Sequence, residues 1–149
     1  MSEKTPSSWE SRPSWLLTQT AAHAQRLVFE GFSSVQARGY HYRLLATLQE
    51  HGPASQADLG RRSGIHLSDM VAAINELAER GLVERAPDPA DRRRNVISLT
   101  TAGKRQLRRL DKRLAETQEE LLAPLSPDER RQLTELLAKL LEHHNERAG

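Results

Sequence analysis

A run of arginines at residues 92–94 follows Asp91 in a segment rich in proline and aspartate. Two short segments with the pattern of strands, at 82–85 and 96–99, flank this segment, and prolines and aspartates between strands favour a tight turn. The pattern therefore predicts a β-hairpin with arginines at its tip. Guanidinium groups suit a narrow DNA minor groove, where the negative potential is strongest. A simple solvated loop is the alternative interpretation of such a turn.

Two short helical patterns joined at Gly64 precede this hairpin. Ser55 is placed to cap the first helix, with Asp58 in the capping-box position. The second pattern, over residues 67–80, has apolar residues at i, i+3, i+4 and i+7, which predicts one buried face. These buried positions are Met70, Ala73, Ile74 and Leu77. The unit predicts a helix-turn-helix whose second helix suits a DNA major groove, and a plain helical hairpin is the alternative.

The outer face of the second helix is small and partly polar. Serine and asparagine can bond base edges or phosphates, and valine or alanine can contact a thymine methyl group. Asp69 could accept from a cytosine amine or stabilise the first turn of its own helix. The predicted DNA-contacting residues are Ser55, Gln56, Ser68, Asp69, Val71, Ala72, Asn75, Asp91, Arg92, Arg93 and Arg94.

The net charge of +2 hides a strong asymmetry. Residues 80–113 carry eleven Lys and Arg against four Asp and Glu, a local +7, whereas the remainder carries eleven against sixteen, or −5. A basic block beside acidic segments is typical of a surface that meets phosphate. A solvated helix face would show the same charge, but the motif inside the block favours duplex DNA as the partner.

The remaining segments are helical at both ends of the chain. Residues 1–12 are rich in serine, proline and charge, which predicts disorder. Thr100 is a predicted N-cap of a long helix, and Ser126-Pro127 begins a last one. The expected fold is mainly α with a small β-hairpin wing. Its parts, within one domain over 1–149, are a winged helix-turn-helix lobe at 40–100 and flanking dimerisation helices at 14–34 and 106–145.

Several classes of protein are excluded or disfavoured. The absence of cysteine removes disulfides, thiolate metal sites and thiol redox sensing. No apolar run approaches the length of a membrane span, and a polar N-terminus without an apolar signal core favours a cytoplasmic protein. No catalytic motif is present, so we predict neither an enzyme nor a cofactor. His143 and His144 point to different helix faces and make a poor chelate, so no metal site is predicted.

The order of elements, together with GLVERAPDPADRRRNVISLTTAGK, resembles the MarR family of bacterial winged-helix transcription regulators over about residues 15–145. The family's Asp-x-Arg wing motif matches Asp91-Arg92-Arg93, and its Leu-Thr-x-x-Gly helix start matches residues 99–103. The resemblance implies a homodimeric repressor on a pseudo-palindromic operator, relieved by a small ligand.

The resemblance also implies individual roles. Arg93 would enter the minor groove, braced by Asp91, and Arg92 or Arg94 would contact phosphates. Ser68, Asp69, Ala72 and Asn75 would occupy base-reading positions. Many relatives carry a long polar residue where this chain has Ala72, and threonine where it has Val71. This departure implies fewer direct base bonds and more weight on the wing and on DNA shape.

Leucine-rich stripes on the terminal helices predict a dimer, because the winged lobe is too small to cover them all; packing within one chain is the alternative. A dimer with two-fold symmetry can bind two DNA half-sites that lie about one helical turn apart. The predicted interface residues are Leu17, Val28, Leu114, Leu121, Leu133, Leu136, Leu137 and Leu140.

A ligand pocket is expected, from the resemblance, between the DNA-binding lobe and the terminal helices. Trp15, His23, His41 and Tyr42 could reach it and would suit a small aromatic or anionic effector; partly exposed packing residues are the alternative. Two other functions stay open at this point. One is a winged-helix module that binds protein, and the other is an architectural DNA-binding protein without sequence preference.

Overall fold

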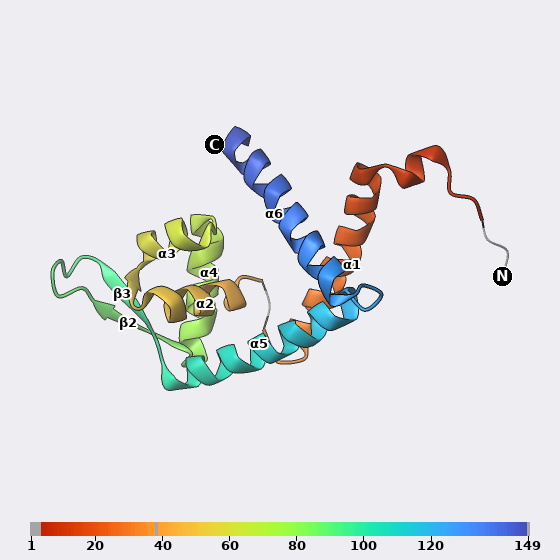
Figure 1. The fold of residues 1–149 in the computed structure, drawn as a ribbon. Helices are drawn as coiled ribbons and strands as arrows, with labels where there is room; N and C mark the ends of the chain where they lie inside the picture. The colour runs from red at the N-terminus through yellow and green to blue at the C-terminus, as the bar shows by residue number, and fades with distance from the viewer. Residues whose placement is uncertain (1–3, 38, 149) are drawn as a thin grey trace.

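The computed structural model describes residues 4–37 and 39–148. A lobe of short helices with a projecting hairpin lies at one end, and two long terminal helices stand at the other (Figure 1). The elements, in chain order, are the 3-10 helix η1 (Ser8–Ser11), α1 (Pro13–Ser33), α2 (His41–His51), β1 (Ala54–Ser55), α3 (Gln56–Ser63), α4 (Leu67–Glu79), β2 (Val83–Pro87), β3 (Asn95–Leu99), α5 (Thr101–Leu121) and α6 (Pro127–Ala148). None of the described helices is long and apolar enough to cross a membrane.

The predicted helix starts are confirmed by their capping bonds. The Ser55 hydroxyl accepts from the backbone N–H of Asp58 at 3.2 Å, which begins α3. The Thr100 hydroxyl accepts from the backbone N–H of Gly103 at 3.0 Å, which begins α5. Ser126 and Glu129 form a reciprocal capping box at α6, with bonds of 2.9 and 3.2 Å. Each bond satisfies a backbone donor that the first helical turn leaves unpaired.

The three strands form one antiparallel sheet in the order β1-β3-β2. The predicted hairpin is confirmed, with its register running from the pair Val83–Leu99 to the pair Pro87–Asn95. Strand β1 was not predicted. It pairs Ala54 with Ile97 and Ser55 with Val96, and two residues are too few to show strand periodicity.

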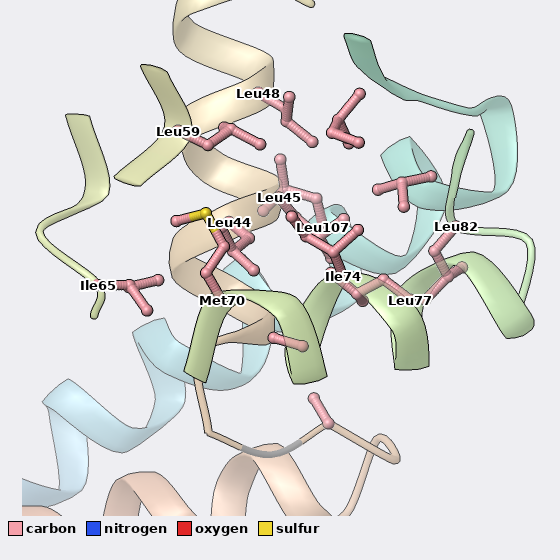
Figure 2. Close-up of a cluster of buried hydrophobic side chains, with 14 of the residues drawn as sticks. Leu44, Leu45, Leu48, Leu59, Ile65, Met70, Ile74, Leu77, Leu82 and Leu107 are labelled. Carbon is pink, nitrogen blue, oxygen red and sulfur yellow. The ribbon is translucent and has the colours of Figure 1, made fainter. Parts of the chain in front are cut away.

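The core lies inside the lobe, where helices α2, α3 and α4 converge on the sheet. Figure 2 shows Met70, Ile74 and Leu77 pointing from α4 toward Leu44 and Leu45 of α2. All five side chains are fully buried. The predicted buried face of α4 is therefore confirmed, and the opposite face of the same helix turns outward.

Helix α5 approaches the base of the hairpin so closely that it requires a glycine. A Cβ on Gly103 would lie 2.0 Å from the carbonyl oxygen of Leu82. Next to this contact, Leu107 and Leu110 of α5 join the core. The chain therefore forms the winged helix-turn-helix with flanking helices that the sequence predicts.

The prediction of disorder over residues 1–12 is wrong for residues 8–11, which form η1. The backbone N–H of Ser7 donates to a Glu10 carboxylate oxygen at 3.0 Å, and the Trp9 ring packs edge-on against Trp15 with centroids 5.3 Å apart. The Ser-x-x-Glu spacing was the available signal, since it is a capping box. The part of this prediction that concerns residues 1–3 lies outside the described residues.

Candidate nucleic-acid interface

Helix α4 presents the predicted recognition surface. Ile65, just before the helix, and Met70, in its second turn, are both buried, so the chain enters the helix from the core. With that face held in the core, the five predicted outer-face residues are all exposed: Ser68, Asp69, Val71, Ala72 and Asn75. The structure therefore brings them together on one side of the lobe, as predicted.

Two polar side chains of this face are held in place. The Ser68 hydroxyl lies 3.1 Å from Nδ1 of His66. The Asn75 carbonyl oxygen accepts a hydrogen bond from a guanidinium nitrogen of Arg85 on β2. Arg85 was missing from the predicted site. It lies two residues from the buried Val83, and strand alternation could have placed both on the side of β2 that faces α4.

Two further predicted residues lie at the start of α3. Ser55 is buried, and its hydroxyl caps α3 while accepting from a guanidinium nitrogen of Arg94 at 3.4 Å. The structure thus gives Ser55 a structural role, linking helix to wing, and its contact with DNA stays a prediction. Gln56, the first residue of α3, is half-buried.

The wing tip is ordered by hydrogen bonds to Asp88. Its side chain accepts from the backbone N–H of Ala90 at 2.9 Å, and its carbonyl oxygen accepts from the N–H of Asp91 at 3.2 Å. The N–H of Asp88 donates across the loop to the Arg94 carbonyl oxygen at 2.8 Å. An aspartate that bonds nearby amides makes a stiff turn, which fixes where the arginines project.

Asp91 holds Arg93 by three bonds. One carboxylate oxygen accepts from both the backbone N–H and Nε of Arg93 at 3.1 Å, and the other lies 3.4 Å from its Nη2. The Arg93 side chain is nevertheless 90% exposed. The bonds from Arg93 lower the pKa of Asp91 below its ordinary value. The predicted brace is present, and the guanidinium stands in solvent at the apex of the wing.

The basic block divides between two surfaces. One part is the wing with residues 92–94, and the other is the first half of α5, where Lys104, Arg105, Arg108, Arg109 and Lys112 are exposed. Figure 1 shows that α5 starts at the base of the hairpin and runs away from its tip. The wing and the outer face of α4 therefore form a surface separate from the basic residues of α5.

The four predicted effector residues do not surround one cavity. Of the four, His41 alone lines a pocket of about 650 Å³ between the end of α1, the start of α2 and the last turn of α4. Its Nε2 lies 2.8 Å from a Glu76 carboxylate oxygen. Trp15 packs on Trp9, and His23 is exposed on α1. The pocket is also lined by Phe29, Glu76, Glu79 and Arg80, which the sequence did not indicate.

Tyr42, the fourth of these residues, is engaged in packing. Its hydroxyl donates to an Asp111 carboxylate oxygen at 2.8 Å, and its ring stacks on Phe32 with centroids 5.4 Å apart. Burial, followed by the bond to Asp111, raises the pKa of Tyr42 to about 12. Tyr42 thus joins α2 to α5 and to α1.

The predicted interface leucines fall into two groups. Val28 and Leu114 pack against the core of their own chain, and Leu121 and Leu133 are half-buried. Leu17, Leu136, Leu137 and Leu140 are exposed, as are Leu16 and Leu141, which were not predicted. Helix α6 buries none of its residues in the single chain.

Comparisons with known proteins agree with this geometry. Residues 33–94 match the model of the MarR family. The chain is 28% identical over 141 residues to the HTH-type transcriptional repressor NicR of Pseudomonas putida, covering 89% of each protein. The solved PcaV transcriptional regulator from Streptomyces coelicolor, in complex with its natural ligand, is 26% identical, with a TM-score of 0.74 over 93% of this chain and 98% of that one.

A probable transcriptional regulator from Pseudomonas aeruginosa, also solved, is 31% identical, with a TM-score of 0.78. The alignment covers 89% of this chain and 98% of that chain. Because the family match falls on the winged lobe and the likeness to this relative covers most of both chains at 31% identity, the chain belongs to the MarR family.

Proposed function

We propose that this protein is a homodimeric transcriptional repressor that binds duplex DNA sequence-specifically and is released by a small ligand. The observation that carries the proposal is Arg93, fixed by Asp91 yet exposed at the tip of a wing beside the outer face of α4. A cation held in place at an exposed apex suits a narrow minor groove, because it loses little freedom on binding. The repressor NicR supports the regulatory role.

The mechanism is steric. Helix α4 enters the major groove with its N-terminal residues toward the bases, while Arg93 enters the adjoining minor groove. Arg92 and Arg94 lie beside it for phosphate contact. A protein bound in this way covers the duplex and excludes polymerase. Such a role makes the protein a binding protein of the cytoplasm, without catalysis or cofactor, and the transcriptional regulators that it resembles support this.

The terminal helices provide the dimer. Helix α6 displays Leu136, Leu137, Leu140 and Leu141 to solvent, and Leu16 and Leu17 lie exposed on α1. Contiguous apolar surface of this kind marks a protein interface. A second copy of the chain covers it and sets two α4 helices against two half-sites about 34–36 Å apart along the duplex.

The effector site is the pocket between α1, α2 and α4. Phe29 offers an aromatic wall, and Arg80, Glu76 and Glu79 come from the last turn of α4 and its C-cap. Two carboxylates beside one guanidinium favour an aromatic ligand with polar groups over a simple anion. A ligand that binds better when α4 is away from its DNA-bound position shifts the population away from the DNA-bound arrangement. The ligand complex of PcaV supports an effector-responsive protein.

The test is selection of bound fragments from a random duplex pool by the purified protein. We expect an inverted repeat with half-sites one turn apart, and a preference over unrelated DNA of roughly a thousandfold or more. Bound DNA without shared sequence would replace the proposal with an architectural protein. Failure to bind any duplex at low salt would leave a protein-interaction module.

A further inference from the structure

The recognition helix carries an exposed apolar edge made of Leu67 and Val71. Leu67 is 63% exposed and Val71 is 38% exposed. Residues four apart on a helix lie one above the other, so the two side chains form a continuous strip over the first two turns of α4. Leu67 was not among the residues that the sequence analysis placed at the DNA.

Folding does not account for this edge. The core is filled from the other side of α4 by Met70, Ile74 and Leu77 (Figure 2), and Ile65, just before the helix, is buried as well. A single exposed leucine is ordinary. Here, two branched apolar residues stand on adjacent turns at the N-terminal end of a recognition helix, the part that meets base edges.

Two polar neighbours on this face are tied to the protein. Ser68 is bonded to His66, and the carbonyl oxygen of Asn75 accepts from Arg85. Asn75 is exposed, so its amide nitrogen can still donate to a partner outside the protein. The Ala72 methyl group is exposed next to Val71. The first two turns of α4 thus offer a major groove the methyl groups of Leu67, Val71 and Ala72, beside the exposed carboxylate of Asp69.

We propose that Leu67 and Val71 recognise thymine methyl groups, so that each operator half-site carries thymines beneath the first two turns of α4. This inference rests on the proposed function. Among the four base pairs, only those with thymine present a methyl group in the major groove, and it protrudes where an apolar side chain can cover it. The major-groove edges of cytosine and guanine are polar. Against Leu67 and Val71 these polar groups would be removed from water without a hydrogen-bond partner, which is unfavourable.

Deoxyuridine provides the probe, because it differs from thymidine by that methyl group alone and pairs identically. The duplex is the operator selected by the purified full-length protein, synthesised with thymine or uracil at the positions beneath α4. Dissociation constants come from fluorescence anisotropy. We expect uracil to weaken binding by about fourfold for each thymine methyl group that is removed from beneath Leu67 or Val71.

Two controls separate methyl recognition from general loss of affinity. Uracil placed beneath the wing should leave affinity unchanged, because thymine and uracil are identical in the minor groove. Leu67→Ala and Val71→Ala should lower the ratio of the affinity for the thymine duplex to the affinity for the uracil duplex toward one. Arg93→Ala should weaken binding to both duplexes and leave this ratio unchanged. Both residues are exposed, so these variants should unfold at the wild-type temperature.

Three results would overturn the inference while leaving the repressor intact: equal affinity of the wild-type protein for both duplexes, a selected operator without thymine beneath α4, or a change of oligomeric state in Leu67→Ala. The wild-type comparison needs no variant and therefore does not depend on folding. If no duplex binds at low salt, the proposed function itself fails, which is a different outcome from specific binding without discrimination.

Discussion

Arg93 and Asp91 illustrate how one side chain positions another at the tip of the wing. A long arginine side chain loses rotamer freedom when it enters a minor groove, and the bonds from Asp91 remove part of that freedom beforehand. The same carboxylate places a negative charge near the DNA, and this charge weakens the attraction between the wing and the phosphates. Positioning outweighs this cost, because the attraction is useful only when the guanidinium points into the groove.

Arg93→Ala should therefore weaken operator binding by about tenfold to a hundredfold, the range for removal of a specific arginine side chain. Because the side chain is exposed, the thermal unfolding midpoint should stay unchanged. Anisotropy titration and circular dichroism measure the two quantities. Arg131→Ala on α6, which removes an exposed arginine paired with Asp128, is the matched control and should bind like wild type. Unchanged affinity of Arg93→Ala would remove the wing from the mechanism.

The pKa of Asp91 gives an independent measure of the brace. Bonds from Arg93 favour the charged carboxylate and lower its pKa in the folded protein. The ordered wing is thus fully stabilised above the ordinary aspartate pKa, and this contribution is lost as pH falls through the lower folded value. We expect carboxyl NMR titration to show that the pKa of Asp91 lies below the ordinary aspartate range. In Arg93→Ala the pKa of Asp91 should rise toward that range. An ordinary Asp91 pKa in the wild-type protein would contradict the brace.

At the scale of elements, Gly103 is the tightest contact between α5 and the winged lobe. A Cβ there would overlap the Leu82 carbonyl oxygen, a backbone atom that cannot move alone. Gly103→Ala should destabilise the fold by about 2–4 kcal/mol, in the range of severe core overpacking. Chemical denaturation measures this change.

The control for Gly103→Ala is Gly60→Ala on α3, where the nearest atom would lie at an ordinary 3.6 Å. Alanine favours a helix over glycine, so Gly60→Ala should be neutral or stabilising. Comparable destabilisation by both variants would show that glycine content, and not the contact with Leu82, sets the stability.

The elements that the sequence predicts well are those with strong local signals. Capping residues marked the starts of α3, α5 and α6, and helical spacing marked the buried face of α4. Strand β1 was missed because its two residues exist only through pairing with β3. The bond from Arg85 to Asn75 was missed for the same reason, since it joins a strand to a helix.

The predicted effector residues show the limit of local signals, since only His41 among the four lines the pocket. Trp15, His23 and Tyr42 were selected by residue type, yet a pocket is defined by which elements converge. Phe29 and Arg80, which line the pocket with His41, lie far apart in the sequence and meet through tertiary packing. Nothing in residue type or spacing distinguishes them from other exposed positions.

At the scale of the whole molecule, we expect the exposed leucines of α6 to hold the dimer together. Leu136→Asp combined with Leu140→Asp should convert the dimer to monomers, because burying two charges in an apolar interface is unfavourable. Sedimentation velocity measures the state. Ala138→Asp with Asn145→Asp adds the same number of aspartates to other exposed positions of α6 and should remain dimeric. A dimer in the leucine variant would place the interface elsewhere.

The distribution of basic charge predicts which residues determine the salt dependence of DNA binding. Each phosphate that a lysine or arginine neutralises releases counterions, so the logarithm of the affinity falls linearly with the logarithm of salt concentration. A dimer uses each phosphate contact twice, so Arg92→Ala should reduce the magnitude of this slope by about two. Lys112 is exposed on α5, which runs away from the wing tip (Figure 1), so Lys112→Ala should leave the slope unchanged. Equal reductions in both variants would mean that the duplex also contacts α5, and the binding surface would have to extend along that helix.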